Sequence, residues 1–337
     1  MRLSDLFISK LSGEWGTDPT DLYAIPVIRT TNFAEYGMIN YANLVYRGIT
    51  PKKVEEKHLK DGDILLEKSG GTDKKPVGRV VYFEAFDSAK YLCNNFVVIL
   101  RPNKEFVVPR YAFYLMLSLY LNGVTVAYQN KTTGIQNLHV KAYLNKCIKL
   151  PSIVFQRKIV SQLNQIVNLI LRRKQQLAKL DELAKSRFIE MFGDPVLNPY
   201  GFEVKNMGEV CTFYTGTGFP NVFQGKSDGD FPFYKVGDIS KNVQNGFKEL
   251  EYCDNYINKD VVDKIRGTII PSGTIVFAKI GEALKLNRRG LTIKNCLVDN
   301  NVMGLKPKEE LNISYFFQLM KDLDMEKYSA STTVPSV

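Results

Sequence analysis

Apolar residues recur at alternating steps of four and three between Phe155 and Phe192. The series contains Ile159, Leu163, Ile166, Ile170, Leu177, Leu180, Ala184 and Met191, and only Arg173 and Arg187 interrupt it. This spacing places one narrow stripe along a helix, which is typical of a coiled-coil seam rather than of a core helix. At ~1.5 Å per residue the helix would be roughly 55 Å long. Burial in a core is the alternative that this segment alone leaves open.

Short strand-like runs and turns alternate before this helix. Strand-like runs occur at Ala24–Ile28, Asp63–Glu67, Val77–Phe83, Phe96–Leu100 and Lys146–Leu150. A second helix is predicted at Pro109–Leu121, where a proline begins it and Asn122-Gly123 follows it. Residues 1–150 are therefore predicted to form a mixed α/β globule.

The pattern begins again after the long helix. Five segments have counterparts in the same order, namely 25–29 with 231–235, 62–70 with 273–281, 94–102 with 299–307, 109–121 with 313–323, and 133–138 with 332–337. Five matches in one order predict a duplicated module. We therefore expect an α+β fold, in which two similar mixed α/β domains at 1–150 and 196–337 are joined by a long coiled-coil-type helix within 151–195.

Charge and cysteine content narrow the class of protein. The 337 residues include 45 Lys and Arg against 35 Asp and Glu, and the net charge of +10 favours a polyanionic partner such as nucleic acid. No run approaches the length of a membrane-spanning helix, and the N-terminus does not resemble a signal peptide. Five scattered cysteines without a CxxC pair argue against a zinc site and for a reducing compartment. We expect a cytoplasmic protein that binds no metal and no membrane.

No catalytic constellation is evident in the sequence. Gly225-Lys226-Ser227 resembles the end of a phosphate-binding loop, but Pro220 stands where that loop needs its first glycine. His58 and His139 have no obvious nucleophile partner. We therefore expect no catalytic residues and no bound cofactor in this chain, which would not be an enzyme by itself.

Basic residues gather at the same place in both copies of the repeat. Residues 67–81 and 278–294 are each predicted to form a strand, a loop and a strand. Such a hairpin can place lysine against DNA phosphates and arginine against guanine edges, and a solvated turn is the other interpretation. The candidate DNA-binding residues are Lys68, Ser69, Lys74, Lys75 and Arg79 in the first copy, and Lys279, Lys285, Arg288, Arg289 and Lys294 in the second.

Residues 150–160 (LPSIVFQRKIV) and 180–188 (LDELAKSRF) resemble the central conserved region of the specificity subunit of type I restriction-modification systems. Residues 231–239 (FPFYKVGDI) and 331–337 (STTVPSV) resemble the target-recognition domains of the same family. Together these stretches extend the resemblance over essentially the whole chain.

The resemblance implies a sequence-specific DNA-binding subunit that directs adenine methylation and cleavage by partner subunits to a two-part target. Each target-recognition domain would read one half of the target, while the central helix would set the spacer and dock the methylation subunits. Those subunits use S-adenosylmethionine, and the restriction subunits that join them use ATP and Mg²⁺. The residues that this comparison assigns to spacer and docking are Gln156, Arg157, Ile159, Leu163, Ile166, Ile170, Leu177, Leu180 and Ala184.

The family also has a second conserved helix that packs antiparallel on the first, and the sequence up to Val337 contains no counterpart. We expect the apolar stripe to be covered by a second copy or by a methylation subunit, unless the chain is an inactive truncated product of gene rearrangement. A stand-alone dimeric DNA-binding regulator is the alternative from another functional class. The recognition half of a fused methyltransferase–nuclease and an inert structural protein are further alternatives.

Overall fold

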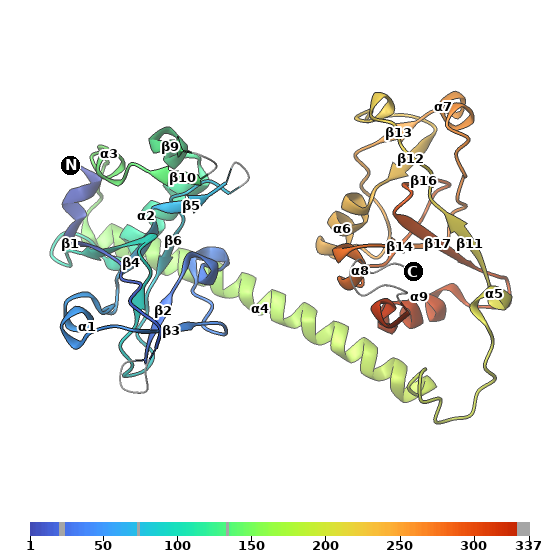
Figure 1. The fold of residues 1–337 in the computed structure, drawn as a ribbon, viewed down its shortest axis with the longest axis horizontal. Helices are drawn as coiled ribbons and strands as arrows, with labels where there is room; N and C mark the ends of the chain where they lie inside the picture. Colours follow the sequence, from blue (N-terminus) through green and yellow to red (C-terminus); the bar gives the residue numbers. More distant parts are fainter. Residues whose placement is uncertain (20–23, 73–74, 133–134, 329–337) are drawn as a thin grey trace. The chain divides into compact units, whose positions relative to one another are not determined.

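The computed structural model describes residues 1–19, 24–72, 75–132 and 135–328. The chain divides into two compact units, Met1–Gln175 and Gln176–Val337. Helix α4 (Ile153–Phe192, 40 residues) is continuous across the boundary between them (Figure 1). This helix confirms the one predicted from the apolar stripe and begins two residues earlier, because Ser152 accepts hydrogen bonds from the backbone N–H groups of Phe155 and Gln156.

A four-stranded antiparallel sheet forms the centre of the first unit. Its strand order is β1 (Phe7–Ser12), β8 (Val97–Pro102), β4 (Ile64–Glu67) and β6 (Val80–Tyr82). All four residues of β4 are buried, which is why this strand reads as a continuous apolar run rather than as an alternating one. Helix α2 (Pro109–Leu121) has the bounds predicted from the sequence. It covers one face of the sheet through Phe113 and Met116.

Two smaller sheets complete the first unit. Strand β2 (Ala24–Ile28) pairs antiparallel with β3 (Val45–Gly48) and parallel with β7 (Leu92–Cys93). Strand β10 (Ile135–Leu138) lies between β5 (Ser69–Gly71) and β9 (Gln129–Thr132). The short helical segments are η1 (Leu3–Leu6), η2 (Thr30–Asn32), η3 (Glu35–Gly37), α1 (Pro51–Lys57), η4 (Val124–Tyr128) and α3 (Val140–Leu144).

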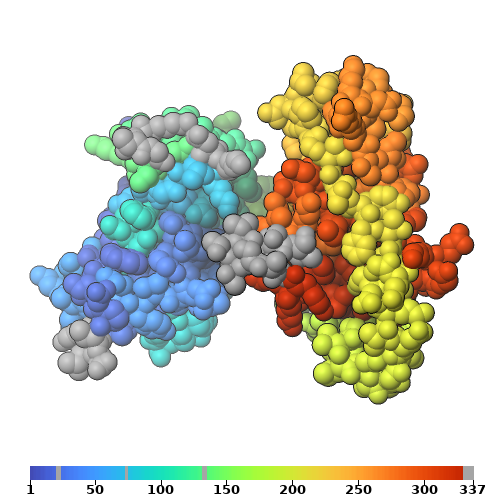
Figure 2. Space-filling model, turned by 45° about the vertical axis from the view of Figure 1, so that its right-hand side comes forward, coloured from blue at the N-terminus to red at the C-terminus, as the bar shows by residue number. Residues whose placement is uncertain are grey.

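The described residues of the second unit repeat the strand order of the main sheet and of the β3–β2–β7 sheet. Its main sheet has the order β11 (Cys211–Thr215), β17 (Val302–Pro307), β14 (Ile275–Ala278) and β15 (Gly290–Leu291), and its smaller sheet has β12 (Phe231–Tyr234) between β13 (Tyr256–Ile257) and β16 (Leu297–Val298). The helical segments are α5 (Met207–Val210), η5 (Asn221–Phe223), α6 (Val236–Gln244), α7 (Lys259–Lys264), α8 (Glu282–Lys285), α9 (Ile313–Asp322) and η6 (Met325–Tyr328). Helix α7 buries Val261 and Val262 and leaves Lys259 at the surface (orange in Figure 2).

Strand register confirms the duplication at the level of single residue pairs. Ile64 of β4 faces Leu100 of β8, and Ile275 of β14 faces Leu305 of β17. These are the partners that the matches of 62–70 with 273–281 and of 94–102 with 299–307 require. The parallel pairs agree as well, since Val27 faces Leu92 and Phe233 faces Leu297. The match of 133–138 with 332–337 lies partly outside the described residues.

The strand predicted at Lys146–Leu150 is wrong. Cys147 makes only an isolated bridge to Arg2, and the chain then enters α4. The Leu3 and Ile148 N–H groups bond the carbonyls of Lys146 and Met1, but the pairing extends no further because η1 begins at Leu3.

Each end of α4 is fixed to the unit to which it belongs. In the first unit Gln156 is fully buried; its side chain accepts a hydrogen bond from the Val108 N–H at 2.8 Å and donates to the carbonyls of Phe106 and Pro151 at 3.2 and 2.9 Å. In the second unit the Tyr315 ring of α9 lies 5.3 Å from that of Phe188 and 4.9 Å from that of Phe192. The helix is therefore part of both folded units rather than a loose linker.

Replacing Gln156 with Ala should lower the free energy of unfolding of the first unit by about 1–3 kcal/mol, because it leaves the buried Val108 N–H and two carbonyls without their partner. Chemical unfolding of the full chain, followed by circular dichroism, measures this. Gln162→Ala, at an exposed position of the same helix, is the matched control. Equal effects of the two substitutions would contradict the anchoring role.

Candidate nucleic-acid interface

The first cationic segment is a strand–loop–strand, as predicted. Strands β4 and β6 pair antiparallel, and the N–H of Glu67 donates to the carbonyl of Arg79 at 2.9 Å. The loop between them also contains β5, which leaves the main sheet and pairs with β10. The hairpin therefore connects the main sheet to a second small sheet, a link that the sequence did not predict.

The loop candidates differ in their surroundings. Lys68 is half-buried and its ammonium donates to the Ser12 hydroxyl at 3.0 Å. Ser69 is half-buried in β5, opposite Asn137. Lys75 is exposed, whereas Lys74 lies outside the described residues. Lys75 is thus the fully accessible cation among the described members of this loop.

Arg79 is held inside the fold by an acidic partner. Its Nε and Nη2 atoms donate to the two carboxylate oxygens of Glu67 at 2.9 and 2.7 Å, and Glu67 is 1% exposed. Nη2 also donates to the carbonyl of Thr30, and the guanidinium lies 5.6 Å from the Phe33 ring. The hydrogen bonds that Arg79 donates to Glu67 raise the pKa of Arg79, so its guanidinium stays charged. Arg79 therefore has a structural role in this conformation, and a contact to DNA would have to compete with Glu67.

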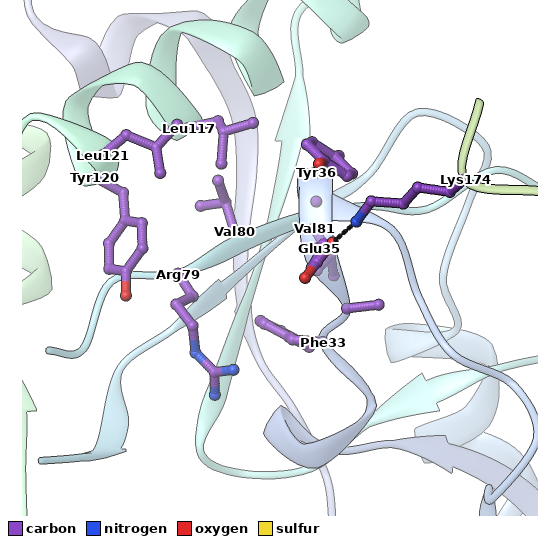
Figure 3. Close-up of a pocket in the computed structure, with 12 residues that line it drawn as sticks. Phe33, Glu35, Tyr36, Arg79, Val80, Val81, Leu117, Tyr120, Leu121 and Lys174 are labelled. Atoms are coloured by element: carbon purple, nitrogen blue, oxygen red, sulfur yellow. Dashed lines mark hydrogen bonds and ion pairs between the residues drawn. The ribbon is translucent and has the colours of Figure 1, made fainter. Parts of the chain in front are cut away.

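A pocket of about 390 Å³ lies beside this pair in the first unit. Figure 3 shows Leu117 and Tyr120 of α2 on one side of it, with Val80 of β6 and the preceding Arg79 below them. On the opposite side Lys174 of α4 forms an ion pair with Glu35 of η3. The pocket is mostly apolar with charged groups at its edge, and no sequence pattern predicted it.

The second cationic segment is also a hairpin, formed by β14 and β15 with the short helix α8 in its loop. Lys285 is exposed and pairs with Glu282 at 2.8 Å. Lys279 and Arg288 are half-buried, and Lys294 is exposed in the turn after β15. Four of the five predicted cations therefore reach the surface at least in part.

Arg289 is the exception, because the structure buries it to 4% exposure. Its Nε donates to the carbonyl of Met320 at 3.1 Å, at the C-terminal end of α9, and its guanidinium lies 4.8 Å from the Phe277 ring. Burial lowers its pKa to about 10, which leaves it charged at neutral pH. We do not retain Arg289 as a DNA contact, since a side chain that faces the core cannot reach a phosphate.

The residues assigned to spacer and docking also divide into two groups. Gln156 is buried within the first unit and is not available to a partner. Ile159, Leu163 and Ile170 are half-buried, and Arg157 and Ala184 are exposed. Ile166, Leu177 and Leu180 are 53–64% exposed, and a groove of about 610 Å³ runs between Ile159 and Leu169. A long apolar face of α4 is thus uncovered within each unit.

The described part of the chain contains no candidate metal site and no candidate membrane span. No group of three or more His, Cys, Asp or Glu side chains there could hold a metal ion. Among the same residues, no helix has the length and apolar character needed to cross a membrane.

A sequence model of the type I restriction modification DNA specificity domain matches residues 14–182 and again residues 199–337. The chain belongs to this family. The family resemblance of the central and recognition segments is thereby confirmed, as is the α+β fold with two similar domains and a long helix.

Two relatives in Methanocaldococcus jannaschii are similar over much of the chain. The specificity subunit of the type I restriction enzyme MjaIX is 26% identical over 299 residues, which are 82% of this chain and 63% of that protein. The MjaVIII specificity subunit is 26% identical over 207 residues, or 58% of this chain and 46% of that protein. The chain thus spans less than two thirds of the length of these relatives.

A crystal structure of the S subunit of a type I restriction-modification system from M. genitalium has the same fold. It aligns with a TM-score of 0.52 at 14% sequence identity, covering 97% of this chain and 77% of that one. At this identity the likeness concerns the fold alone.

Replacing Arg289 with Ala should destabilise the second unit by about 1–3 kcal/mol, because it leaves a cavity and removes the donor to the end of α9. Thermal unfolding of the full chain measures the change. Arg288→Ala, one residue away but half-exposed, should change stability by less than about 0.5 kcal/mol. A larger loss for Arg288→Ala than for Arg289→Ala would reverse the assignment.

Proposed function

We propose that this chain is the DNA-binding specificity subunit of a type I restriction-modification complex. In this proposal residues 1–150 and 196–337 are two target-recognition domains, each reading half of a two-part DNA sequence. Residues 151–195 set the spacer and dock the partner subunits. The observation that carries the proposal is the family match of both halves of the chain.

The duplicated hairpin supports a DNA-reading role for both units. Strands β4–β6 and β14–β15 occupy equivalent positions in equivalent sheets, and each hairpin displays accessible cations at its loop. Backbone phosphates attract such cations, and the net charge of +10 strengthens the attraction. We retain Lys68, Ser69, Lys74, Lys75, Lys279, Lys285, Arg288 and Lys294 as proposed DNA contacts.

The partners would supply the chemistry. Methylation subunits with S-adenosylmethionine would modify adenine, and restriction subunits with ATP and Mg²⁺ would cut unmodified DNA. The chain itself would bind none of these cofactors and would act in the cytoplasm with the DNA. The family match favours this role over a stand-alone regulator.

The exposed face of α4 is the proposed docking surface. Leu177 and Leu180 are 64% and 59% exposed on a segment of the helix that also carries many charged side chains. A contiguous apolar stripe on a soluble helix is stabilised when a partner covers it. We propose that a methylation subunit or a second copy of the chain is that partner.

DNA binding is tested on the full chain assembled with methylation subunits from the same host. The plot of log K against log salt has a negative slope. Lys75→Ala and Lys294→Ala should each reduce the magnitude of this slope by about 0.9, the value for one lost phosphate contact. Lys104→Ala is the control, because this exposed lysine follows β8 at the end of the sheet away from the 68–79 loop. An assembled wild-type complex that does not retain DNA at moderate salt would contradict the proposed function.

Docking is tested with the double variant Leu177→Lys, Leu180→Lys. It should lose co-purification with methylation subunits, or the dimer if the chain self-pairs, while its melting temperature stays unchanged because both side chains are exposed. Gln175→Lys adds charge on the opposite side of the helix and should leave assembly intact. A wild-type chain that sediments as a stable monomer at micromolar concentration excludes self-pairing, and a double variant that keeps both associations excludes docking through this stripe.

A further inference from the structure

The arginines at the base of the two hairpins occupy equivalent positions. In β4–β6, Leu65 faces Val81, Leu66 faces Val80, and the Glu67 N–H bonds the Arg79 carbonyl. In β14–β15, Ile275 faces Leu291 and Val276 faces Gly290. The regular pairing ends at Gly290, but the Arg289 guanidinium lies 4.8 Å from the Phe277 ring, and counting on by one further residue sets Arg288 opposite Ala278. Arg288 and Ala278 are therefore the counterparts of Arg79 and Glu67.

Side-chain burial agrees with this equivalence. Val80 and Arg289 are buried, and each packs with the helix that covers the sheet, α2 or α9. The preceding residues, Arg79 and Arg288, are both half-exposed. Both arginines lie just before these strands, β6 and β15, and the alternation of an extended chain would put Arg288 on the side that Arg79 uses in the first unit.

The partner at this position differs between the two units. Glu67 binds Arg79 through both carboxylate oxygens. Ala278 has no polar side-chain atom. In the part of the chain that the structure describes, the Arg288 guanidinium forms no ion pair and no hydrogen bond with another residue. One unit therefore neutralises this arginine internally, and the other leaves its charge unpaired.

We propose that the last residue of β4 and β14 decides whether the hairpin arginine is available to a DNA backbone phosphate. Ala278 leaves Arg288 free to bind one, and Glu67 withholds Arg79. This inference rests on the proposed DNA-binding function and goes beyond it, because it makes the two recognition units chemically unequal at equivalent positions. The determinant is a residue that does not touch DNA itself.

Electrostatics gives the reason. A two-pronged bond between guanidinium and carboxylate satisfies the donors that a phosphate would otherwise take, and the buried Glu67 would be left with an unpaired charge if Arg79 moved to DNA. Arg288 carries no such penalty. The second unit should therefore form one more phosphate contact at this position than the first.

The test measures the salt dependence of binding to a 40-base-pair duplex of mixed sequence, using the chain assembled with its methylation subunits. Arg288→Ala should reduce the magnitude of the negative slope of log K against log salt by about 0.9. Ala278→Glu should do the same by pairing with Arg288. The double variant Ala278→Glu, Arg288→Ala should fall no further than either single change, because both remove one contact. Glu67→Gln should increase the magnitude of the slope by up to about 0.9, because it releases Arg79 to bind a phosphate.

Two controls separate charge pairing from other effects. Ala278→Gln has nearly the size of glutamate without its charge and should keep the wild-type slope. Thr212→Glu adds the same charge at an exposed position of β11, the opposite edge of the sheet from β15, and should also keep it. Thermal unfolding identifies any variant that loses its fold. If a variant of the second unit is lost in this way, the salt dependence of Glu67→Gln tests the proposal in the first unit.

The outcomes are distinguishable. A wild-type complex without affinity for the duplex would overturn the proposed function itself. If the wild-type complex binds, an unchanged slope for folded Ala278→Glu, or an equal fall for Ala278→Gln, would overturn the assignment of Arg288. An unchanged slope for Glu67→Gln would overturn the assignment of Arg79.

Discussion

The pairing of β4 with β8, and of β14 with β17, fixes the positions of both cationic hairpins. Strands β4 and β14 are buried along their whole length, and a shift of register by one residue would turn their side chains to the opposite faces of the sheet. The hairpin residues next to them then alternate between the helix-covered face and the opposite face. This alternation decides whether an arginine packs in the core or can bind a ligand. Arg289 is buried, and the neighbouring Arg288 is half-exposed.

Helix α4 combines two requirements that are usually separate. Gln156 and Phe188 bury one side of it in the folded units, while Leu177 and Leu180 remain exposed on another. Anchoring at both ends keeps the helix continuous, and the exposed stripe leaves an apolar surface for a partner. The proposed function, in which the chain holds two reading domains and recruits an enzyme, calls for a helix of this kind.

Much of the fold could be predicted from sequence because it is recorded in local pattern. Helix α2 has the predicted bounds, and the internal matches made β14 and β17 the counterparts of β4 and β8, although the pairing of these strands was not predicted. The fate of individual charges could not be predicted. Arg79 and Arg289 look like other members of a basic run until the hairpin register shows which face each occupies. Glu67, which ends the run Ile-Leu-Leu-Glu, could have predicted that Arg79 is paired inside the fold, because a carboxylate buried in a strand needs a cationic partner.

The central claim is that this chain directs adenine methylation to a two-part DNA target. The most direct measurement is the adenine-methylation pattern of the host genome, read at single-base resolution with the gene present, deleted and restored. The account predicts that one split methylation motif disappears with the gene and returns with it. A genome in which every split motif stays methylated after deletion would contradict the claim.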